Sequence, residues 1–264
     1  MSTTYPIFIT GTGTDVGKTI VTTALLRAFA QQGHHVAGLK PVQTGCTYSP
    51  HGELLAPDVE LYKTVCPSAY HEACLCFEPA CSPHLAAQMA GTTISAYDMV
   101  HHLHTVMENL PAKSVVCIEG SGGAMVPLNT SETFLDIMRM VKAPVIIAAA
   151  NELGTINHTL LTIHSLRSAQ IPLLGFVLTT PHKPSSLILE QDMRLDNRRM
   201  IETMANLPCL GEIPWLSHLN DEDATHRETA WECAAHCLAP ALKLTRHWFA
   251  PHSQKSHTHN LHAP

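Results

Sequence analysis

The clearest chemical signal in the chain is the stretch of residues 11–19, GTGTDVGKT. It follows an apolar, β-prone run and leads into a helical pattern that begins at Ile20, which is the order of a phosphate-binding loop. Lys18 is then placed to reach the β- and γ-phosphates of a nucleotide, and the Thr19 hydroxyl to bind Mg²⁺. Five residues separate Gly11 from Gly17 where the standard Walker A motif has four, so the loop is one residue longer. A Gly/Thr-rich turn without a ligand is the weaker alternative.

Two charged residues end apolar stretches. Lys40 closes residues 35–40, and Glu119 closes residues 114–119. Burying an unpaired lysine is costly, and nucleotide-hydrolysing folds place a Mg²⁺-binding carboxylate at such a strand end. The alternatives are a Lys40 side chain that extends to solvent and a Glu119 that only opens a glycine-rich turn. By spacing alone, Asp58 is the N-cap of a short helix.

These residues depend on a framework in which strand-like and helix-like segments alternate. Strands that are apolar on both faces indicate a parallel sheet with both faces covered, and ligands bind beyond the carboxyl ends of its strands. We therefore predict an α/β fold, a mainly parallel β-sheet flanked by helices on both faces, of the P-loop NTPase kind. The expected strands are residues 5–10, 35–40, 114–119, 144–150, 173–179 and 209–213. The expected helices are residues 20–32, 84–90, 95–110, 131–141, 156–169, 185–206 and 222–246, the last interrupted near Pro240.

Composition narrows the class of protein. The 264 residues are 45% apolar and 14% charged, with a net charge of −6 and no basic run, which argues against a nucleic-acid partner. Neither a secretory signal nor an apolar stretch of about 18 residues is visible, so we expect a cytoplasmic protein without a membrane partner. We expect one domain over residues 1–246 and a His-rich, disordered tail over residues 247–264.

The nine cysteines include no Cys-x-x-Cys pair. We therefore expect reduced, mostly buried thiols. Cys74, Cys76 and Cys81 gather in one loop-like region, where a metal site is the less favoured interpretation.

Taken together, these motifs resemble those of the dethiobiotin synthetases, from the first strand to about residue 221. The longer phosphate loop is a feature of that family. Seven blocks in the same order carry the resemblance: residues 11–19, Lys40-Pro41-Val42 with Thr44-Gly45, Asp58, Ser82-Pro83-His84, residues 119–123, residues 153–158 and residues 211–216.

The resemblance implies a cyclo-ligase of biotin synthesis. In that reaction 7,8-diaminopelargonic acid and CO₂ form a carbamate, the carbamate oxygen attacks the γ-phosphate of ATP, and the second amine captures the mixed anhydride. Lys40, Lys18 and Thr14 are the implied catalytic residues, and Thr44, Glu119, Gly122 and Asn157 the implied substrate-binding residues. Thr19, Asp58 and Glu119 would bind Mg²⁺, which prefers hard oxygen ligands.

The resemblance also implies an ATP site and a partner subunit. Asn157 would hold the substrate carboxylate across the interface of a homodimer, with the active site at that interface. Thr179 stands where the family commonly has Asn to read adenine, and Asp221 where Glu is common. The implied ATP-binding residues are Asp15, Val16, Gly17, Lys18, Thr19, Ile20, Asp58, Glu119, Gly120, Ser121, Gly122, Thr179, Thr180, Pro214, Trp215, Leu216 and Asp221.

Three other functions compete with this one. A partition-type or septum-site ATPase switch would carry a lysine near the start of the phosphate loop, where position 12 is Thr. A cobyrinate-type amidating ligase would need a further glutaminase domain. A non-catalytic regulatory relative should have lost Lys40 or the metal carboxylates, and this chain retains them.

Overall fold

The computed structural model describes residues 4–183, 188–219, 221 and 223–249. Within them a seven-stranded sheet has the order β5-β2-β6-β1-β7-β8-β9, and every pairing is parallel. Its central strands are apolar on both faces, which suits a sheet that is covered on both sides. The strands are β1 (Tyr5–Gly11), β2 (Val36–Thr44), β5 (Tyr70–Phe77), β6 (Val115–Gly123), β7 (Val145–Ala150), β8 (Leu173–Thr179) and β9 (Cys209–Ile213).

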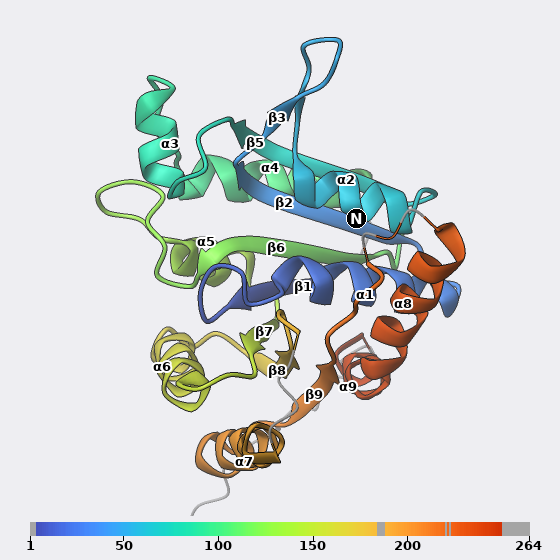
Figure 1. Cartoon of the computed structure of the whole chain (residues 1–264). Helices are drawn as coiled ribbons and strands as arrows, with labels where there is room; N and C mark the ends of the chain where they lie inside the picture. Colours follow the sequence, from blue (N-terminus) through green and yellow to red (C-terminus); the bar gives the residue numbers. More distant parts are fainter. Residues whose placement is uncertain (1–3, 184–187, 220, 222, 250–264) are drawn as a thin grey trace, which may run out of the picture.

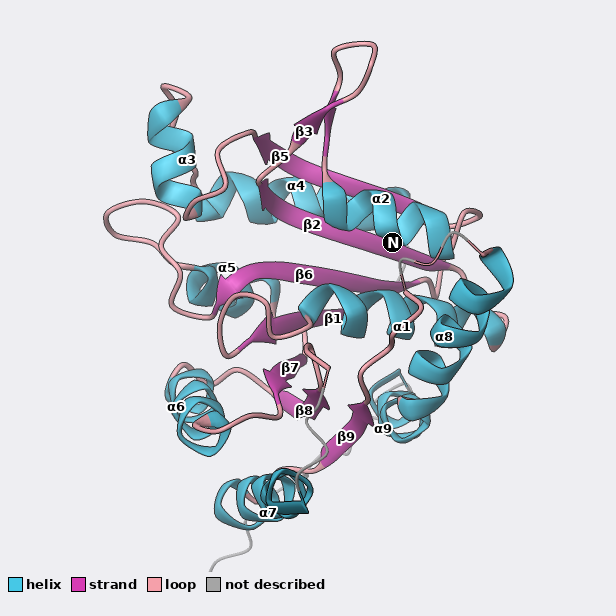
Figure 2. Cartoon of the chain, viewed as in Figure 1, coloured by secondary structure: helices cyan, strands magenta, loops and turns pink. Residues whose placement is uncertain are grey.

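Helices cover both faces of this sheet (Figures 1 and 2). On one face α1, α2, α8 and α9 enclose a core that includes Phe29, Tyr62 and Trp231. On the other, α4 to α7 enclose a core that includes Leu103 and Phe134. The helices are α1 (Lys18–Gln31), α2 (Pro57–Val65), α3 (Pro83–Met89), α4 (Ala96–Asn109), α5 (Phe134–Val141), α6 (Thr155–Ser168), α7 (Ile188–Ala205), α8 (Ala224–Cys237) and α9 (Ala239–Phe249). The predicted α/β class is confirmed.

The arrowheads of β2, β5 and β6 point to one side of the molecule, where the loop between β1 and α1 also lies (Figure 1). A short hairpin, β3 (Thr47–Tyr48) and β4 (Leu54–Leu55), projects from the sheet on the way to α2. Ligand-binding groups are therefore gathered at the carboxyl edge, as expected for this topology.

Strand β5 was not predicted, and its presence changes two neighbouring predictions. It pairs with β2 as far as Thr44, so β2 continues past Lys40. Strand β6 likewise continues past Glu119, with Gly123 paired to Gly11 of β1. The prediction that Lys40 and Glu119 end their strands is therefore wrong: both side chains leave from within strands.

Two local predictions also need correction, and a third is confirmed. Asp58 is in the first turn of α2, and the N-cap is Ala56, because Pro57 takes the first helical position. The interruption predicted near Pro240 in the last helical stretch is confirmed, and it falls at Leu238. Cys74 and Cys76 are in strand β5, not in a loop.

Only the first residues of the predicted tail are among the residues that the structure describes. Helix α9 extends to Phe249, and residues 250–264 lie outside the described residues. All nine cysteines are free thiols. Among the described helices, none combines the length and the apolar character needed to cross a bilayer.

Candidate active site

The loop between β1 and α1 ends at Gly17, the N-cap of α1, which has a left-handed backbone with φ of 81°. No side chain caps this helix, so its first backbone N–H groups are available to an anion. The Lys18 ammonium folds back over the loop and donates to the carbonyl of Gly13 at 2.7 Å. Burial lowers the pKa of Lys18 to about 8, against the opposing effect of nearby carboxylates.

The second lysine lies between two carboxylates. Lys40 Nζ is 2.6 Å from Asp58 Oδ2 and 2.7 Å from Glu119 Oε1. Its side chain is buried, which by itself disfavours the charge, but the two carboxylates outweigh burial and raise the pKa of Lys40. Lys40 is therefore a fixed cation at neutral pH.

Three oxygen-bearing side chains converge next to this lysine. Thr19 Oγ1 is 3.1 Å from Asp58 Oδ1 and 3.0 Å from Glu119 Oε1, although the three residues come from α1, α2 and β6. A hydroxyl and two carboxylates are hard oxygen donors, and they suit a divalent cation such as Mg²⁺.

Tyr62 is a member of this cluster that sequence reasoning missed. Its buried hydroxyl donates to Glu119 Oε2, on the side of the carboxylate away from Lys40. Burial and the neighbouring Glu119 raise the pKa of Tyr62 well above its ordinary value, so the hydroxyl stays a donor. Tyr62 follows Asp58 by four residues, which places both on one face of α2, and that spacing was the available signal.

A cavity of about 760 Å³ opens at this edge of the sheet. Most predicted site residues line it, including both lysines and all three proposed metal ligands. The predicted residues in its lining are Thr14, Asp15, Gly17, Lys18, Thr19, Ile20, Lys40, Thr44, Asp58, Glu119, Ser121, Gly122, Thr179, Thr180, Pro214, Trp215 and Leu216.

Four predicted residues are not part of this lining. Val16 and Gly120 nevertheless offer backbone carbonyls to Thr179 and Lys40, at 2.9 and 3.4 Å. The other two are Asn157, which is exposed in the first turn of α6, and Asp221.

Asp221 belongs to a separate surface cluster. Its Oδ2 is 3.0 Å from His218 Nδ1 and 3.1 Å from His226 Nδ1. The backbone N–H of Asp223 and then the two histidines lower the pKa of Asp221 to about 2. Asp221 therefore faces protein groups, not the cavity.

Thr179, the expected reader of the base, has a different contact. It is buried, and its hydroxyl donates to the carbonyl of Val16 at 2.9 Å. Its methyl carbon would lie 2.8 Å from a Cβ at position 17, so only glycine fits there without displacement. Thr179 thus supports the phosphate loop.

Further lining residues were missed as site residues. Most of them lie in loops, whereas Gln43 and Ile213 lie in strands β2 and β9 and Pro83 begins helix α3. The segment after β5 is the main example, although Ser82 and Pro83 belong to one block of the resemblance. The missed residues are Gln43, Ala80, Cys81, Ser82, Pro83, Val126, Pro181, His182, Ile213 and Leu219.

Comparisons with known proteins agree with this geometry. A family model described as an AAA domain matches residues 6–223. A protein of Anoxybacillus flavithermus named ATP-dependent dethiobiotin synthetase BioD is 34% identical over 228 residues, covering 85% of this chain and 98% of its own. A protein of the same name from Nitrosospira multiformis is 36% identical over 211 residues, covering 79% and 87%.

Solved structures match the fold at low identity. The Aquifex aeolicus MinC:MinD cell division complex gives a TM-score of 0.55 at 12% identity, covering 93% of this chain and 95% of that one. The Pyrococcus furiosus cell division ATPase MinD gives 0.51 at 16% identity, covering 91% and 99%. These likenesses identify a P-loop NTPase fold.

Proposed function

The chain belongs to the family of ATP-dependent dethiobiotin synthetases, and we propose that it is the cyclo-ligase that forms dethiobiotin from 7,8-diaminopelargonic acid, CO₂ and ATP. The observation that carries the proposal is the convergence of Lys18, Lys40 and three oxygen ligands on one cavity beside the phosphate loop. A carbamate and a triphosphate are both anionic, so their reaction needs concentrated positive charge.

The phosphate end of the site follows from the loop and its helix. The free N–H groups at the start of α1 and the Lys18 ammonium would hold the β- and γ-phosphates of ATP. A bound anion favours the charged form of Lys18, which burial otherwise disfavours. Thr180 and the Pro214–Leu216 stretch line the same cavity and would contact the nucleoside.

Mg²⁺ is the cofactor that the oxygen ligands suit best, and its proposed ligands are Thr19, Asp58 and Glu119. When bound, it would neutralise charge on the phosphates of ATP. Tyr62 keeps the Glu119 carboxylate oriented for this task by its hydrogen bond to Oε2.

The role of Lys40 is electrostatic. Because its pKa is raised, it cannot accept a proton from the substrate amines at neutral pH. It can stabilise negative charge on the carbamate and on the transferring γ-phosphate. Thr14, Thr44 and Gly122 line the cavity around it and would position the diamine carbamate.

A homodimer completes the proposal. Asn157 is exposed and outside the cavity, which suits a residue that serves the site of a partner subunit. Leu153, in the turn before α6, is 90% exposed, and Leu161, four residues after Asn157 on α6, is 59% exposed, so a partner subunit would cover two large apolar side chains there. A cytoplasmic location accords with the free thiols.

The reaction can be tested directly with purified protein, the diamine, labelled bicarbonate and MgATP. We expect a labelled cyclic urea and ADP in equal amounts, and no label without the diamine. ATP hydrolysis without labelled product would overturn the proposal and favour an ATPase switch of the partition type. Parallel runs with GTP and CTP measure the nucleotide preference.

The dimer has its own test. Sedimentation should give twice the chain mass, and Asn157→Ala should raise the KM for the diamine while the KM for ATP stays unchanged. A monomer with full activity would overturn the shared-site arrangement.

A further inference from the structure

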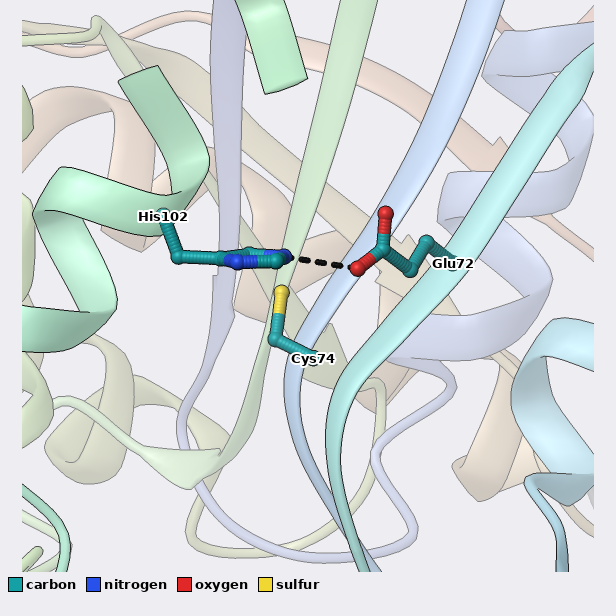
Figure 3. A group of neighbouring side chains, drawn as sticks. All are labelled: Glu72, Cys74 and His102. Carbon is teal, nitrogen blue, oxygen red and sulfur yellow. Dashed lines mark hydrogen bonds and ion pairs between the residues drawn. The ribbon is translucent and has the colours of Figure 1, made fainter. Parts of the chain in front are cut away.

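We propose that Glu72, Cys74 and His102 form a second metal site, which binds Zn²⁺ or another ion with high affinity for thiolate and fastens strand β5 to helix α4 (Figure 3). None of the three residues lines the active-site cavity. The site is therefore separate from the proposed Mg²⁺ ligands and independent of the proposed function.

The fold brings these side chains together. Glu72 and Cys74 are two residues apart in β5, so they project from the same face of this edge strand. His102 comes from α4, which covers that face. Figure 3 shows the imidazole and the carboxylate pointing at each other, with the Cys74 sulfur beside them.

The distances suit a single ion. One ligand atom from each of the three residues lies within 4.8 Å of the others. Ligand atoms on one tetrahedral zinc ion are about 3–4 Å apart, so small side-chain adjustments are enough. His102 Nε2 and Glu72 Oε1 are 2.6 Å apart and must separate by about 1 Å when the ion replaces their hydrogen bond. The Tyr70 hydroxyl donates to the other carboxylate oxygen, Oε2, and so fixes the Glu72 orientation.

The donor set selects the kind of ion. A thiolate, an imidazole and one carboxylate suit Zn²⁺, whereas Mg²⁺ prefers oxygen ligands alone. Burial, and then Glu72, raise the pKa of the Cys74 thiol to about 12, so the ion must displace the thiol proton, which passes to solvent. Only ions that bind thiolate strongly can do so. The fourth coordination position is left for water beside the half-exposed His102.

A metal ion at this site would affect the segment that follows β5. The strand leads into the segment that contains Ala80, Cys81 and Ser82, which lines the active-site cavity. An ion that links β5 to α4 would stabilise this edge of the sheet. We therefore expect Zn²⁺ to raise the Tm of the protein.

Cobalt titration of the full-length protein, under a non-chelating reductant, tests the site. We expect one Co²⁺ per chain to give a thiolate-to-metal charge-transfer absorption that Zn²⁺ abolishes by displacement. The other three-residue group among the described residues, His218, Asp221 and His226, has no sulfur and cannot give this band.

Matched variants locate the ion. Cys74→Ser should abolish the charge-transfer band, whereas Cys233→Ser, at an exposed cysteine on α8, should retain it. His102→Gln should weaken Zn²⁺ binding at least about tenfold and remove the Tm shift, whereas His104→Gln, on the same helix, should do neither.

Because His102 is exposed, His102→Gln carries the test if Cys74→Ser does not fold. Absence of a thiolate band in the wild type, or a band that survives Cys74→Ser, would overturn the proposal. Glu72 and His102 would then be a hydrogen-bonded pair beside a thiol.

Discussion

Replacement of Lys40 by methionine should destabilise the folded protein, not only inactivate it. Lys40 is 3% exposed, and its ammonium lies 2.6 and 2.7 Å from two carboxylates. Its removal leaves Glu119, which is fully buried, and Asp58 without the cation that contacts both, so that among the described residues only Lys18 compensates their charge. Breaking a buried pair in this way costs about 3–5 kcal/mol, a large share of the roughly 5–15 kcal/mol that stabilises a domain.

Urea denaturation of Lys40→Met and of a matched control gives the magnitude. Lys63 makes an exposed ion pair with Glu60 at 2.8 Å, so Lys63→Met tests the same chemistry without burial and should cost less than about 1 kcal/mol. Adding Glu119→Gln to Lys40→Met should recover part of the loss, because it removes the uncompensated charge.

The pH dependence of the Lys40 effect has a defined sign. The folded-state pKa of Lys40 is raised, so its contribution is fully present below the unfolded-state pKa and is lost only as pH rises through the folded one. The part of the Lys40→Met cost that comes from the charge of Lys40 itself should therefore be the same at about pH 7 and pH 9. A loss no larger than that of Lys63→Met would refute the assignment of a buried, charged Lys40.

Three further perturbations follow from the same site. The pKa of Lys18 is about 8, so Lys18 should take up about half a proton when a triphosphate binds near pH 8, and less at lower pH. Calorimetry in buffers of different ionisation enthalpy measures this uptake, and proton release would contradict it. Gly17→Ala should destabilise the protein more than Gly33→Ala, because both glycines have φ of 81° but only a Cβ at position 17 would meet Thr179. Equal losses of unfolding free energy in urea denaturation would count against this contact. Tyr62→Phe removes the hydrogen-bond donor to the buried Glu119, so the free energy of unfolding should fall by about 1.5–3 kcal/mol and the Mg²⁺ affinity by about 10–100-fold. Mg²⁺ titration measures the affinity, and an unchanged affinity would show that the hydroxyl does not orient the carboxylate.

The fold was predictable where burial dictates the sequence. The strand Val145–Ala150 is apolar on both faces, and such runs revealed six of the seven strands of the main sheet among the described residues. Strand β5 was missed because it is an edge strand that is partly exposed along most of its length, with polar His71 and Glu72 in its sequence. Missing β5 also made β2 look shorter than it is and left the segment after β5 unassigned.

Part of the site could likewise be predicted from the sequence, and part could not. The phosphate loop is contiguous in sequence, so Lys18 and Thr19 could be assigned from local spacing. The cluster of Lys40, Asp58 and Glu119 joins residues from three elements, and spacing alone gave Asp58 only a capping role. Their proximity came from the family resemblance, not from the local pattern.

Thr179 illustrates a position with a contact that the resemblance does not imply. Its hydroxyl donates to the Val16 carbonyl and its side chain packs on Gly17, so it acts on the geometry of the phosphate loop. Thr179→Val would remove the hydrogen bond while keeping the shape, at a cost of about 1 kcal/mol. Because the loop holds phosphates common to all nucleotides, kcat/KM should fall by a similar factor for ATP, CTP and GTP. A change in the ratio among them would show that Thr179 reads the base after all, despite its contact with Val16.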